Sequence, residues 1–428
     1  MKKLSLIFPG QGSQYVGMGK RLYENSGTAR QVFEEVSDSL NMDMAKLCFD
    51  SGSSELMLTE NTQPALLTVS VSMFRVYMEQ GGAEPSYLAG HSLGEISALV
   101  CTNAIKLGDA AKIVRQRGRF MQETVTLGEG VMAAISGIDV ESIEKQCNIL
   151  QSIGRVVVIS NYNSPSQTVI SGTADGVEEV CRELEKLGAK AVVLNVSAPF
   201  HSPLMKPAAK KFKAELEKYE YQPLRWPVIS NVTGLPYANE NTIISNLCEQ
   251  IYKPVQWVYT MDYLKSSGVD TLVELGPKDV LKNLSVKIAP TIKALSYDKP
   301  EDEDVIANLT SRNQIVKQSR IKLLTRCLAI AVCTPNNNWD NEEYLQGVVE
   351  PYKKIEKCVE ELEKSNEEPS EEQMTEAVVM LQSVFRTKRT PLEEQRERFQ
   401  QLIDELGMEQ FILKTVSESE VSSSLIRN

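Results

Sequence analysis

Apolar residues in the first 300 positions follow two different periods. Short β-branched or aromatic runs predict buried strands at 4–8 and 87–89. Around 29–47, around 62–80 and from Gly94 onward, apolar residues recur every three or four positions, which predicts amphipathic helices. Strands and helices that alternate in this way are typical of a layered α/β domain.

The order of elements changes between residues 129 and 196. The pattern there predicts strands at 131–136, 156–160, 167–171 and 191–196, with helices at 140–149 and 177–187. This β-α-β-β-α-β order describes a ferredoxin-like unit. We therefore expect such a subdomain at 129–196, inserted into a larger domain that resumes near Ser197. A cleft between two such units is a natural place for an active site.

The chain after residue 298 has a helical pattern only. Amphipathic stretches are expected around 315–330, 341–364, 371–387 and 391–406. We predict that 299–428 forms three or four packed helices, with a frayed, Ser-rich end after about residue 415. The sequence Lys-Pro-Glu-Asp-Glu-Asp at 299–304 marks a change in composition and predicts a linker near residue 300.

Charge and composition narrow the classes of function. The formal net charge is −11, and residues 301–428 supply most of it, with 16 basic against 25 acidic residues. An acidic chain disfavours nucleic acid and anionic membranes as main partners. The longest apolar run, 327–333, is too short to span a bilayer. Eight cysteines without a CxxC pair predict neither a metal site nor a redox motif, and they favour a reducing cytoplasm.

The segment Gly90-His91-Ser92-Leu93-Gly94 matches the G-x-S-x-G pattern of a nucleophile elbow. A strand is predicted before it and a helix after it, which is the context that this motif requires. The glycines matter because the serine occupies a tight turn with no room for neighbouring side chains. The pattern also occurs by chance, so the flanking elements decide in favour of Ser92 as a nucleophile.

The histidines identify a candidate base. A serine hydroxyl needs a neighbouring base near neutral pH, and imidazole is the usual one. The chain has two histidines. His91 adjoins Ser92, and adjacent side chains on such a turn point apart, so His201 is the better candidate. The alternative is that His201 is an ordinary structural histidine.

Two further segments suggest how an acyl group is held. A glycine loop after the first strand, 9–14, could present backbone N–H donors to an oxyanion, together with the N–H of Leu93. It could equally be a simple strand-to-helix connection. Arg117 lies in a basic run and could bind a carboxylate in two-pronged fashion, although a solvated helix face is the simpler explanation.

Eight motifs in order give the chain a family resemblance: FPGQGSQYVGMG, NTQPALL, GHSLGE, RGRFMQE, NSPSQTVISG, SAPFHSPLM, EQIYKPVQW and ELGP. Through them, residues 1 to about 290 resemble the malonyl-CoA:acyl carrier protein transacylases of fatty acid and polyketide synthesis. The resemblance implies an α/β-hydrolase-like core made of 1–128 and 197–298.

The resemblance also implies roles for individual residues. Ser92 would be acylated and His201 would act as base and then acid, oriented by a backbone carbonyl near Gln250. The remaining residues would hold the oxyanion (Gln11 and Leu93) or bind substrate (Arg117, Met121, Phe200, Gln63 and His91). Phe200 would disfavour an α-methyl branch and so select malonyl over methylmalonyl. Without the resemblance, Gln63 and Gln250 would be ordinary polar residues of helices.

The implied reaction passes a malonyl group from malonyl-CoA to the phosphopantetheine thiol of an acyl carrier protein, without a cofactor or metal. The extension at 299–428 departs from the usual family length. It resembles discrete transacylases that act in trans on polyketide or hybrid lipopeptide synthases, although it could also be a packed appendage that only stabilises the core. Two other functions stay open: an acyl hydrolase that uses the same serine, and a non-catalytic docking subunit.

Overall fold

The computed structural model describes residues 3–124, 129–196, 198–365, 367–406 and 408–418. The chain divides near residue 310 into two compact units, which are described separately. Within the described residues, no helix has the length and apolar character needed to cross a bilayer.

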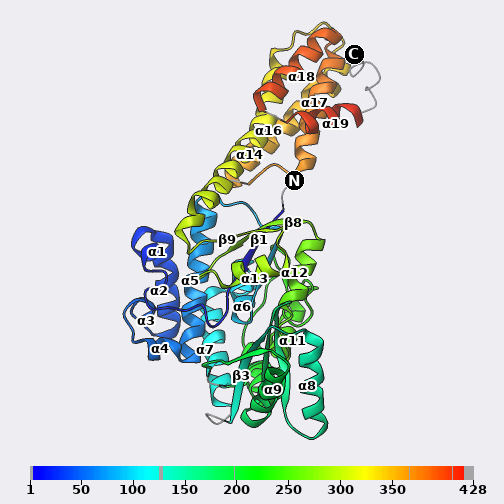
Figure 1. The fold of residues 1–428 in the computed structure, drawn as a ribbon. Helices are drawn as coiled ribbons and strands as arrows, with labels where there is room; N and C mark the ends of the chain where they lie inside the picture. Colours follow the sequence, from blue (N-terminus) through cyan, green and yellow to red (C-terminus); the bar gives the residue numbers. More distant parts are fainter. Residues whose placement is uncertain (1–2, 125–128, 197, 366, 407, 419–428) are drawn as a thin grey trace. The chain divides into compact units, whose positions relative to one another are not determined.

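A five-stranded parallel sheet forms the centre of the first unit (Figure 1). Its strand order is β7-β2-β1-β8-β9. The strands are β1 Lys3–Phe8, β2 Tyr87–Gly90, β7 Val228–Ile229, β8 Val269–Glu274 and β9 Lys293–Ser296. Along β1, Leu6 and Phe8 join one hydrophobic core while Ile7 joins another. Successive side chains of a strand point to opposite faces, so both faces of the central strand are covered. This arrangement confirms the predicted layered α/β domain.

Helices cover both faces of this sheet. The bounds in the first unit are α1 Lys20–Asn25, α2 Gly27–Leu40, α3 Met44–Phe49, α4 Ser53–Met57, α5 Thr59–Glu79, α6 Leu93–Cys101, α7 Leu107–Glu123, α10 Lys206–Leu216, α11 Ile243–Gln250, α12 Trp257–Ser266 and α13 Val280–Ile288, with short 3-10 turns at Pro203–Met205 and Glu240–Thr242. Residues of α2, α5, α6 and α7 pack with Leu6 and Phe8, whereas residues of α12 and α13 pack with Ile7. Helix α5 is buried on nearly all sides, which explains its weak amphipathic pattern.

The single helix expected around 29–47 is wrong, because two helices occupy this segment. Asn41 has φ 50°, the left-handed conformation that ends a helix. Asp43 then begins α3, since its carboxylate accepts a hydrogen bond from the N–H of Lys46 at 2.8 Å. Asparagine and aspartate at this spacing were the sequence signal for the break.

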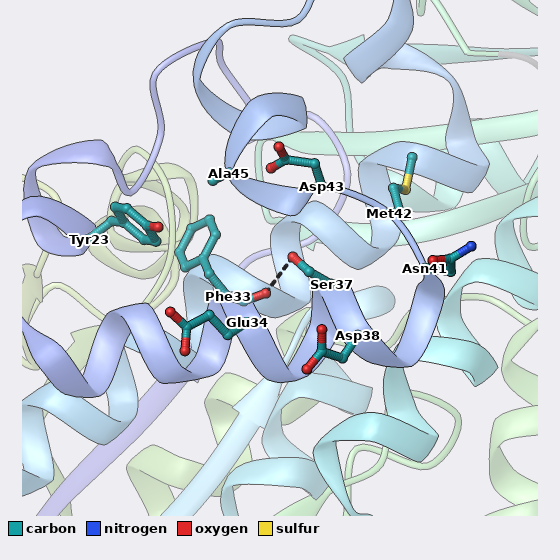
Figure 2. Close-up of a pocket in the computed structure, with 9 residues that line it drawn as sticks. All are labelled: Tyr23, Phe33, Glu34, Ser37, Asp38, Asn41, Met42, Asp43 and Ala45. Carbon is teal, nitrogen blue, oxygen red and sulfur yellow. Dashed lines mark hydrogen bonds between the residues drawn. The ribbon is translucent and has the colours of Figure 1, made fainter.

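A surface hollow of about 530 Å³ lies where α2 and α3 meet (Figure 2). Phe33 and the acidic residues Glu34, Asp38 and Asp43 are among the residues that line it. No lysine or arginine is among its lining residues. Such a surface repels anions, so this hollow is unsuited to a ligand that has carboxylate or phosphate groups.

The predicted ferredoxin-like order is confirmed. Strands β3 Gly130–Ser136, β4 Val157–Ser164, β5 Gln167–Thr173 and β6 Lys190–Val193 form an antiparallel sheet in the order β4-β5-β3-β6, with α8 Val140–Ser152 and α9 Ala174–Lys186 between strands. The last strand is shorter than the predicted 191–196, and as an exposed edge strand it receives little support from packing. The expected subdomain boundaries fall at 125–128 and Ser197, which lie outside the described residues.

The small subdomain is joined to the large one by backbone pairing at β4. The N–H of Tyr162 donates to the carbonyl of Val255 at 3.0 Å, and the N–H of Val255 donates to the carbonyl of Ser160 at 2.8 Å. Residue 161 is thereby fixed at the seam between the two sheets. Side chains from this part of β4 can therefore face those of the large domain.

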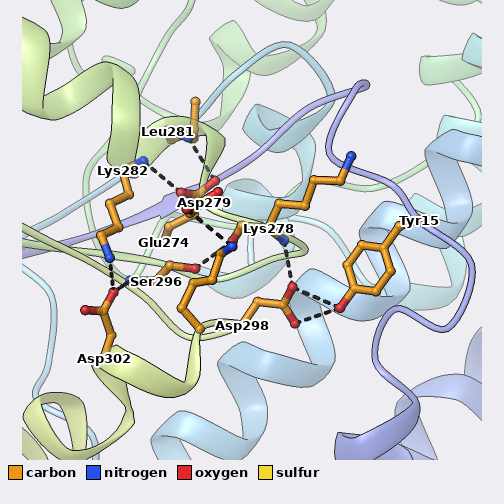
Figure 3. Close-up of polar contacts among 10 residues, drawn as sticks. Tyr15, Glu274, Lys278, Asp279, Leu281, Lys282, Ser296, Asp298 and Asp302 are labelled. Carbon is orange, nitrogen blue, oxygen red and sulfur yellow. Dashed lines mark hydrogen bonds and ion pairs between the residues drawn. The ribbon is translucent and has the colours of Figure 1, made fainter.

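Polar contacts fix the loops at the carboxyl ends of β8 and β9 (Figure 3). Glu274 accepts from the N–H groups of Leu281 and Lys282 at the start of α13, at 3.0 and 2.8 Å. Asp298 accepts from the hydroxyl of Tyr15 and from the N–H of Lys278. The ammonium of Lys278 also donates to the carbonyl of residue 12 at 3.1 Å, so these loops support the glycine loop that follows β1.

The second unit is helical, as predicted. Its helices are the later part of α14 Pro300–Cys333, α15 Asn341–Tyr344, a π-helical turn at Leu345–Val349, α16 Glu350–Ser365, α17 Glu371–Thr387, α18 Leu392–Leu406 and α19 Glu409–Glu418. They have a hydrophobic core of their own, which includes Leu324, Cys327, Leu381 and Phe385.

Two expectations for this region are wrong. The linker expected near residue 300 is the first turn of α14, because proline is favoured in the first turn of a helix and the acidic residues 301–303 suit its N-terminal dipole. The helices outnumber the expected three or four, since α19 is also formed. Of the frayed end expected after about residue 415, positions 416–418 are helical and 419–428 lie outside the described residues. Ile412 and Val416 bury this helix against the core of the second unit.

We expect the close approach of α6 to β1 to tolerate no side chain at Gly94. A Cβ there would lie 2.0 Å from the carbonyl oxygen of Phe8. Gly94→Ala should therefore lower the free energy of unfolding by about 1 to 3 kcal/mol, as forced overpacking does. The measurement is urea denaturation followed by tryptophan fluorescence in a Trp339→Phe background, which leaves Trp226 and Trp257 of the first unit as reporters.

The matched control for this prediction is Gly27→Ala at the start of α2. A Cβ at Gly27 would meet only the guanidinium of Arg30 at 4.0 Å. Its effect should stay within about 0.5 kcal/mol. Equal effects of the two substitutions would contradict the packing argument.

Candidate active site

Ser92 lies at the sharp turn between β2 and α6, as the elbow pattern predicted. Its backbone has φ 53° and ψ −105°, which is unfavourable for a residue with a side chain. Two partners hold the strained peptide: the N–H of Ser92 donates to Asn231 Oδ1 at 2.6 Å, and its carbonyl accepts from Gln250 Nε2 at 2.9 Å. The surrounding structure thus fixes the turn that presents the hydroxyl.

The hydroxyl of Ser92 and the imidazole of His201 meet, although 109 residues separate them along the chain. The distance from Ser92 Oγ to His201 Nε2 is 2.9 Å. His201 Nδ1 lies 2.6 Å from the carbonyl oxygen of Gln250. A carbonyl only accepts, so Nδ1 has the proton and Nε2 has the free lone pair. Nε2 can therefore take the proton of the serine.

Burial keeps this imidazole neutral. His201 is 4% exposed, and desolvation, followed by the nearby cation of Arg117, lowers its pKa to about 3. The carbonyl of Gln250 opposes this shift but does not overcome it. A neutral imidazole is the form that acts as a base, so the site is ready for proton abstraction at neutral pH.

Arg117 of α7 is the largest charged group at the site and is 1% exposed. Its guanidinium donates to Gln63 Oε1 at 2.9 Å, to Gln250 Oε1 at 2.8 Å and to Ser92 Oγ at 3.1 Å. Arginine only donates, so the hydroxyl hydrogen of Ser92 must point to His201. Burial lowers the pKa of Arg117 to about 10, partly opposed by the charge of Glu95, and the side chain remains a cation at neutral pH.

A cavity of about 300 Å³ opens onto these groups between the large domain and the small subdomain. Nine of the ten residues proposed from the sequence line it: Gln11, Gln63, His91, Ser92, Leu93, Arg117, Met121, Phe200 and His201. The tenth, Gln250, lies behind the cavity and contacts both Arg117 and Ser92. The structure therefore brings all the candidate residues into one region.

His91 is not aimed at the serine, as expected for a neighbour on a tight turn. Its Nε2 lies 2.9 Å from Asn163 Oδ1 of the small subdomain, and its ring centroid is 5.8 Å from that of Trp257. Desolvation lowers the pKa of His91, opposed by the hydrogen bond to Asn163. His91 thus forms part of the wall between the two domains.

Sequence reasoning missed several polar residues at the site. Asn161 and Asn163 line the cavity from β4, while Asn231 and Glu95 lie behind Ser92. Glu95 belongs to the GHSLGE motif, but three positions after the serine on an apolar helix it gave no sign of its partners. The asparagines come from distant segments that only the fold brings together.

Glu95 is fully buried, and desolvation raises its pKa to about 7. Hydrogen bonds from Tyr237, Gln250 and Asn231 oppose this rise, as does the charge of Arg117. No group of three or more metal-ligating side chains is found in the part of the chain that the structure describes.

The sequence of this chain is similar to a known protein family and to individual proteins within it. The model of the acyl transferase domain family matches residues 5–307. A malonyl CoA-acyl carrier protein transacylase of Bacillus subtilis is 38% identical over 395 residues, which cover 92% of this chain and 99% of that protein. This similarity includes most of the helical extension.

Solved structures resemble the first unit. An acyl carrier protein S-malonyltransferase from Vibrio cholerae is 40% identical with a TM-score of 0.69, and the match covers 71% of this chain and all of that chain. A malonyl-transacylase in complex with its type II PKS acyl-carrier protein is also 40% identical, with a TM-score of 0.70, covering 72% of this chain and 99% of that chain.

We expect the imidazole of His201 to stay neutral as the pH falls through the usual histidine range. Its pKa is lowered to about 3, so the ring should not gain a proton between pH 8 and pH 5. The chain has two histidines, so ring C–H resonances in an NMR titration can be assigned with a His91→Gln variant. A shift of the His201 resonance with a midpoint near 6.5 would contradict the burial argument.

Proposed function

The chain belongs to the acyl transferase domain family, and from this premise we propose that it transfers a malonyl group from malonyl-CoA to an acyl carrier protein through an acylated Ser92. The observation that supports this mechanism most directly is the 2.9 Å contact between Ser92 Oγ and His201 Nε2 beside the buried cation of Arg117. The site combines a nucleophile, a neutral base and a carboxylate-binding group in one cavity.

In the first half-reaction, His201 Nε2 takes the hydroxyl proton while Ser92 Oγ forms a bond to the thioester carbon. The backbone N–H groups of Gln11 and Leu93 hold the resulting oxyanion, since both residues line the cavity beside the serine. Collapse of this intermediate breaks the carbon–sulfur bond, and CoA leaves with the proton from His201. The carbonyl of Gln250 keeps the imidazole in the tautomer that both steps need.

In the second half-reaction, the phosphopantetheine thiol gives its proton to His201 and attacks the acyl-serine. The carbon–oxygen bond breaks, and Ser92 regains a proton from the imidazole. The acyl group leaves on the carrier protein, and the free enzyme is restored. Protein groups alone suffice for the balance of atoms and charge in both steps.

Arg117 selects the acyl group. Its guanidinium lies within hydrogen-bond reach of Ser92, and its Nε has no partner among the residues that the structure describes. A malonyl carboxylate would pair with this buried cation, whereas an acetyl group would leave it without a directly bound carboxylate. Met121 and Phe200 line the same cavity and limit the room for an α-methyl branch.

The helical extension and the cysteines bear on the partner of the enzyme and on its compartment. We propose that the enzyme acts in trans on carrier domains of a polyketide or hybrid lipopeptide synthase in the cytoplasm. Eight free cysteines suit a reducing compartment. The helical unit after residue 310 has its own hydrophobic core, as a separate module that docks onto a synthase would need.

Transfer should exceed hydrolysis when a carrier protein is present. We expect carbon-14 malonyl-CoA to label the enzyme alone at Ser92, and addition of a phosphopantetheinylated carrier domain should move the label to that domain. Intact mass spectrometry and gel autoradiography measure both steps, with Ser92→Ala as the unlabelled control. Free malonate as the main product with and without carrier would support the alternative, an acyl hydrolase.

Arg117→Ala should remove the preference for malonyl over acetyl. Loss of a charge-assisted pair with the carboxylate is worth about 1.5 to 3 kcal/mol, so kcat/KM for malonyl-CoA should fall about tenfold to a hundredfold or more. Slow acetyl transfer should persist because Ser92 and His201 remain. The measurement is the ratio of kcat/KM values for the two CoA thioesters, and an unchanged ratio would exclude the proposed role.

A further inference from the structure

We propose that Glu95 is a positioning residue for acyl transfer, which orients the side-chain amide of Gln250 and thereby the guanidinium of Arg117 that receives the acyl carboxylate. This inference rests on the proposed function and adds a residue to it. Glu95 touches neither the cavity nor the reacting atoms, so its effect must pass through other side chains.

Glu95 lies three residues after Ser92, in the first turn of α6, with no exposed surface. Its Oε2 accepts from the N–H of Asn231 at 3.1 Å and from Gln250 Nε2 at 2.5 Å, and its Oε1 accepts from the hydroxyl of Tyr237. A buried carboxylate is costly unless hydrogen bonds satisfy it. Both of its oxygens are used, which indicates a site built around a carboxylate.

The carboxylate is one of three contacts that set which way the amide of Gln250 points. Gln250 Nε2 donates to Glu95 and to the carbonyl of Ser92, and Oε1 accepts from Arg117. The carbonyl accepts only and the guanidinium donates only, so a flipped amide would oppose like groups at both contacts and at Glu95. When ionised, above its pKa of about 7, Glu95 adds most to this preference, because hydrogen bonds to an ionised group are stronger.

Asn231 gives Glu95 a second connection to the nucleophile. Its N–H binds Glu95, its Oδ1 accepts from the N–H of Ser92 at 2.6 Å, and its Nδ2 donates to the carbonyl of Gly90 at 2.6 Å. The peptide of Ser92 is therefore held from one side by Asn231 and from the other by Gln250. Glu95 is the acceptor that these two supports share.

The arrangement also places the amide of Gln250 between the carboxylate of Glu95 and the guanidinium of Arg117. Glu95 acts on Arg117 electrostatically, while the amide of Gln250 lies between them. A carboxylate bound directly to Arg117 would compete with the acyl carboxylate of the substrate. With the amide between them, Glu95 offsets part of the charge of the buried cation and leaves guanidinium donors available for a ligand.

The first test is Glu95→Gln assayed at pH 8, above the pKa of about 7 of Glu95, where the substitution keeps the shape of the side chain and removes its charge. We expect kcat/KM for malonyl-CoA to fall about tenfold or more, with a smaller change for acetyl-CoA, so that the malonyl preference declines. The ratio of the two values is the decisive readout, because general destabilisation would lower both rates together.

The matched control is Glu274→Gln. Glu274 is equally buried, and desolvation raises its pKa to about 8, but its partners are the N–H groups of Leu281 and Lys282 at the start of α13 (Figure 3). This substitution should lower the melting temperature and leave the malonyl-to-acetyl ratio unchanged. An equal change of that ratio in both variants would overturn the proposal.

Gln250→Met provides a second test if Glu95→Gln does not fold. This variant removes the amide but keeps the backbone carbonyl that binds His201. It should lower the malonyl-to-acetyl ratio as Glu95→Gln does, and the double variant should lower that ratio no further than either single one, because both act on Arg117 through the amide of Gln250. A full malonyl preference in Gln250→Met, or additive losses in the double variant, would refute the proposal. If the unsubstituted enzyme itself fails to transfer malonyl, the proposed function fails instead.

Discussion

The hydroxyl of Ser92 is shared between a neutral imidazole and a buried guanidinium, and the site depends on both contacts. His201 Nε2 can only accept in its present tautomer, and Arg117 can only donate, so the hydroxyl has one orientation in which both are satisfied. Each partner in turn binds Gln250, through its backbone carbonyl and its side-chain oxygen. One residue at the end of α11 therefore orients base and cation together.

This arrangement requires a fold in which distant segments meet at buried positions. Ser92 follows a strand of the parallel sheet, His201 follows the small subdomain, and Gln250 ends a helix of the large domain. The backbone pairing between β4 and Val255 joins the two sheets close to this point. Burial there lowers the pKa of His201, so the fold supplies the chemical state of the base as well as its position.

Sequence reasoning predicted the parts that local patterns or counting could decide. The glycines around Ser92 predicted the elbow, and two histidines left His201 as the base. Gln250 was expected only as a nearby carbonyl, because nothing in its segment indicates that its amide binds Arg117 and Ser92 as well. Asn231 and Glu95 could not be found, since their partners are set by tertiary packing. The linker expected near residue 300 was wrong because a charge run alone does not distinguish a loop from the acidic first turn of a helix.

The charges at the site also link substrate selection to base strength. In the free enzyme, the cation of Arg117 is second only to desolvation in lowering the pKa of His201. A carboxylate bound to Arg117 would offset that cation, so the pKa of the imidazole would rise and the base would become stronger. An acetyl group brings no carboxylate and would leave the base weak. Under the proposed mechanism, the group that selects the acyl chain thus also improves proton transfer for the correct substrate, which is a reason for a guanidinium to lie so close to the nucleophile.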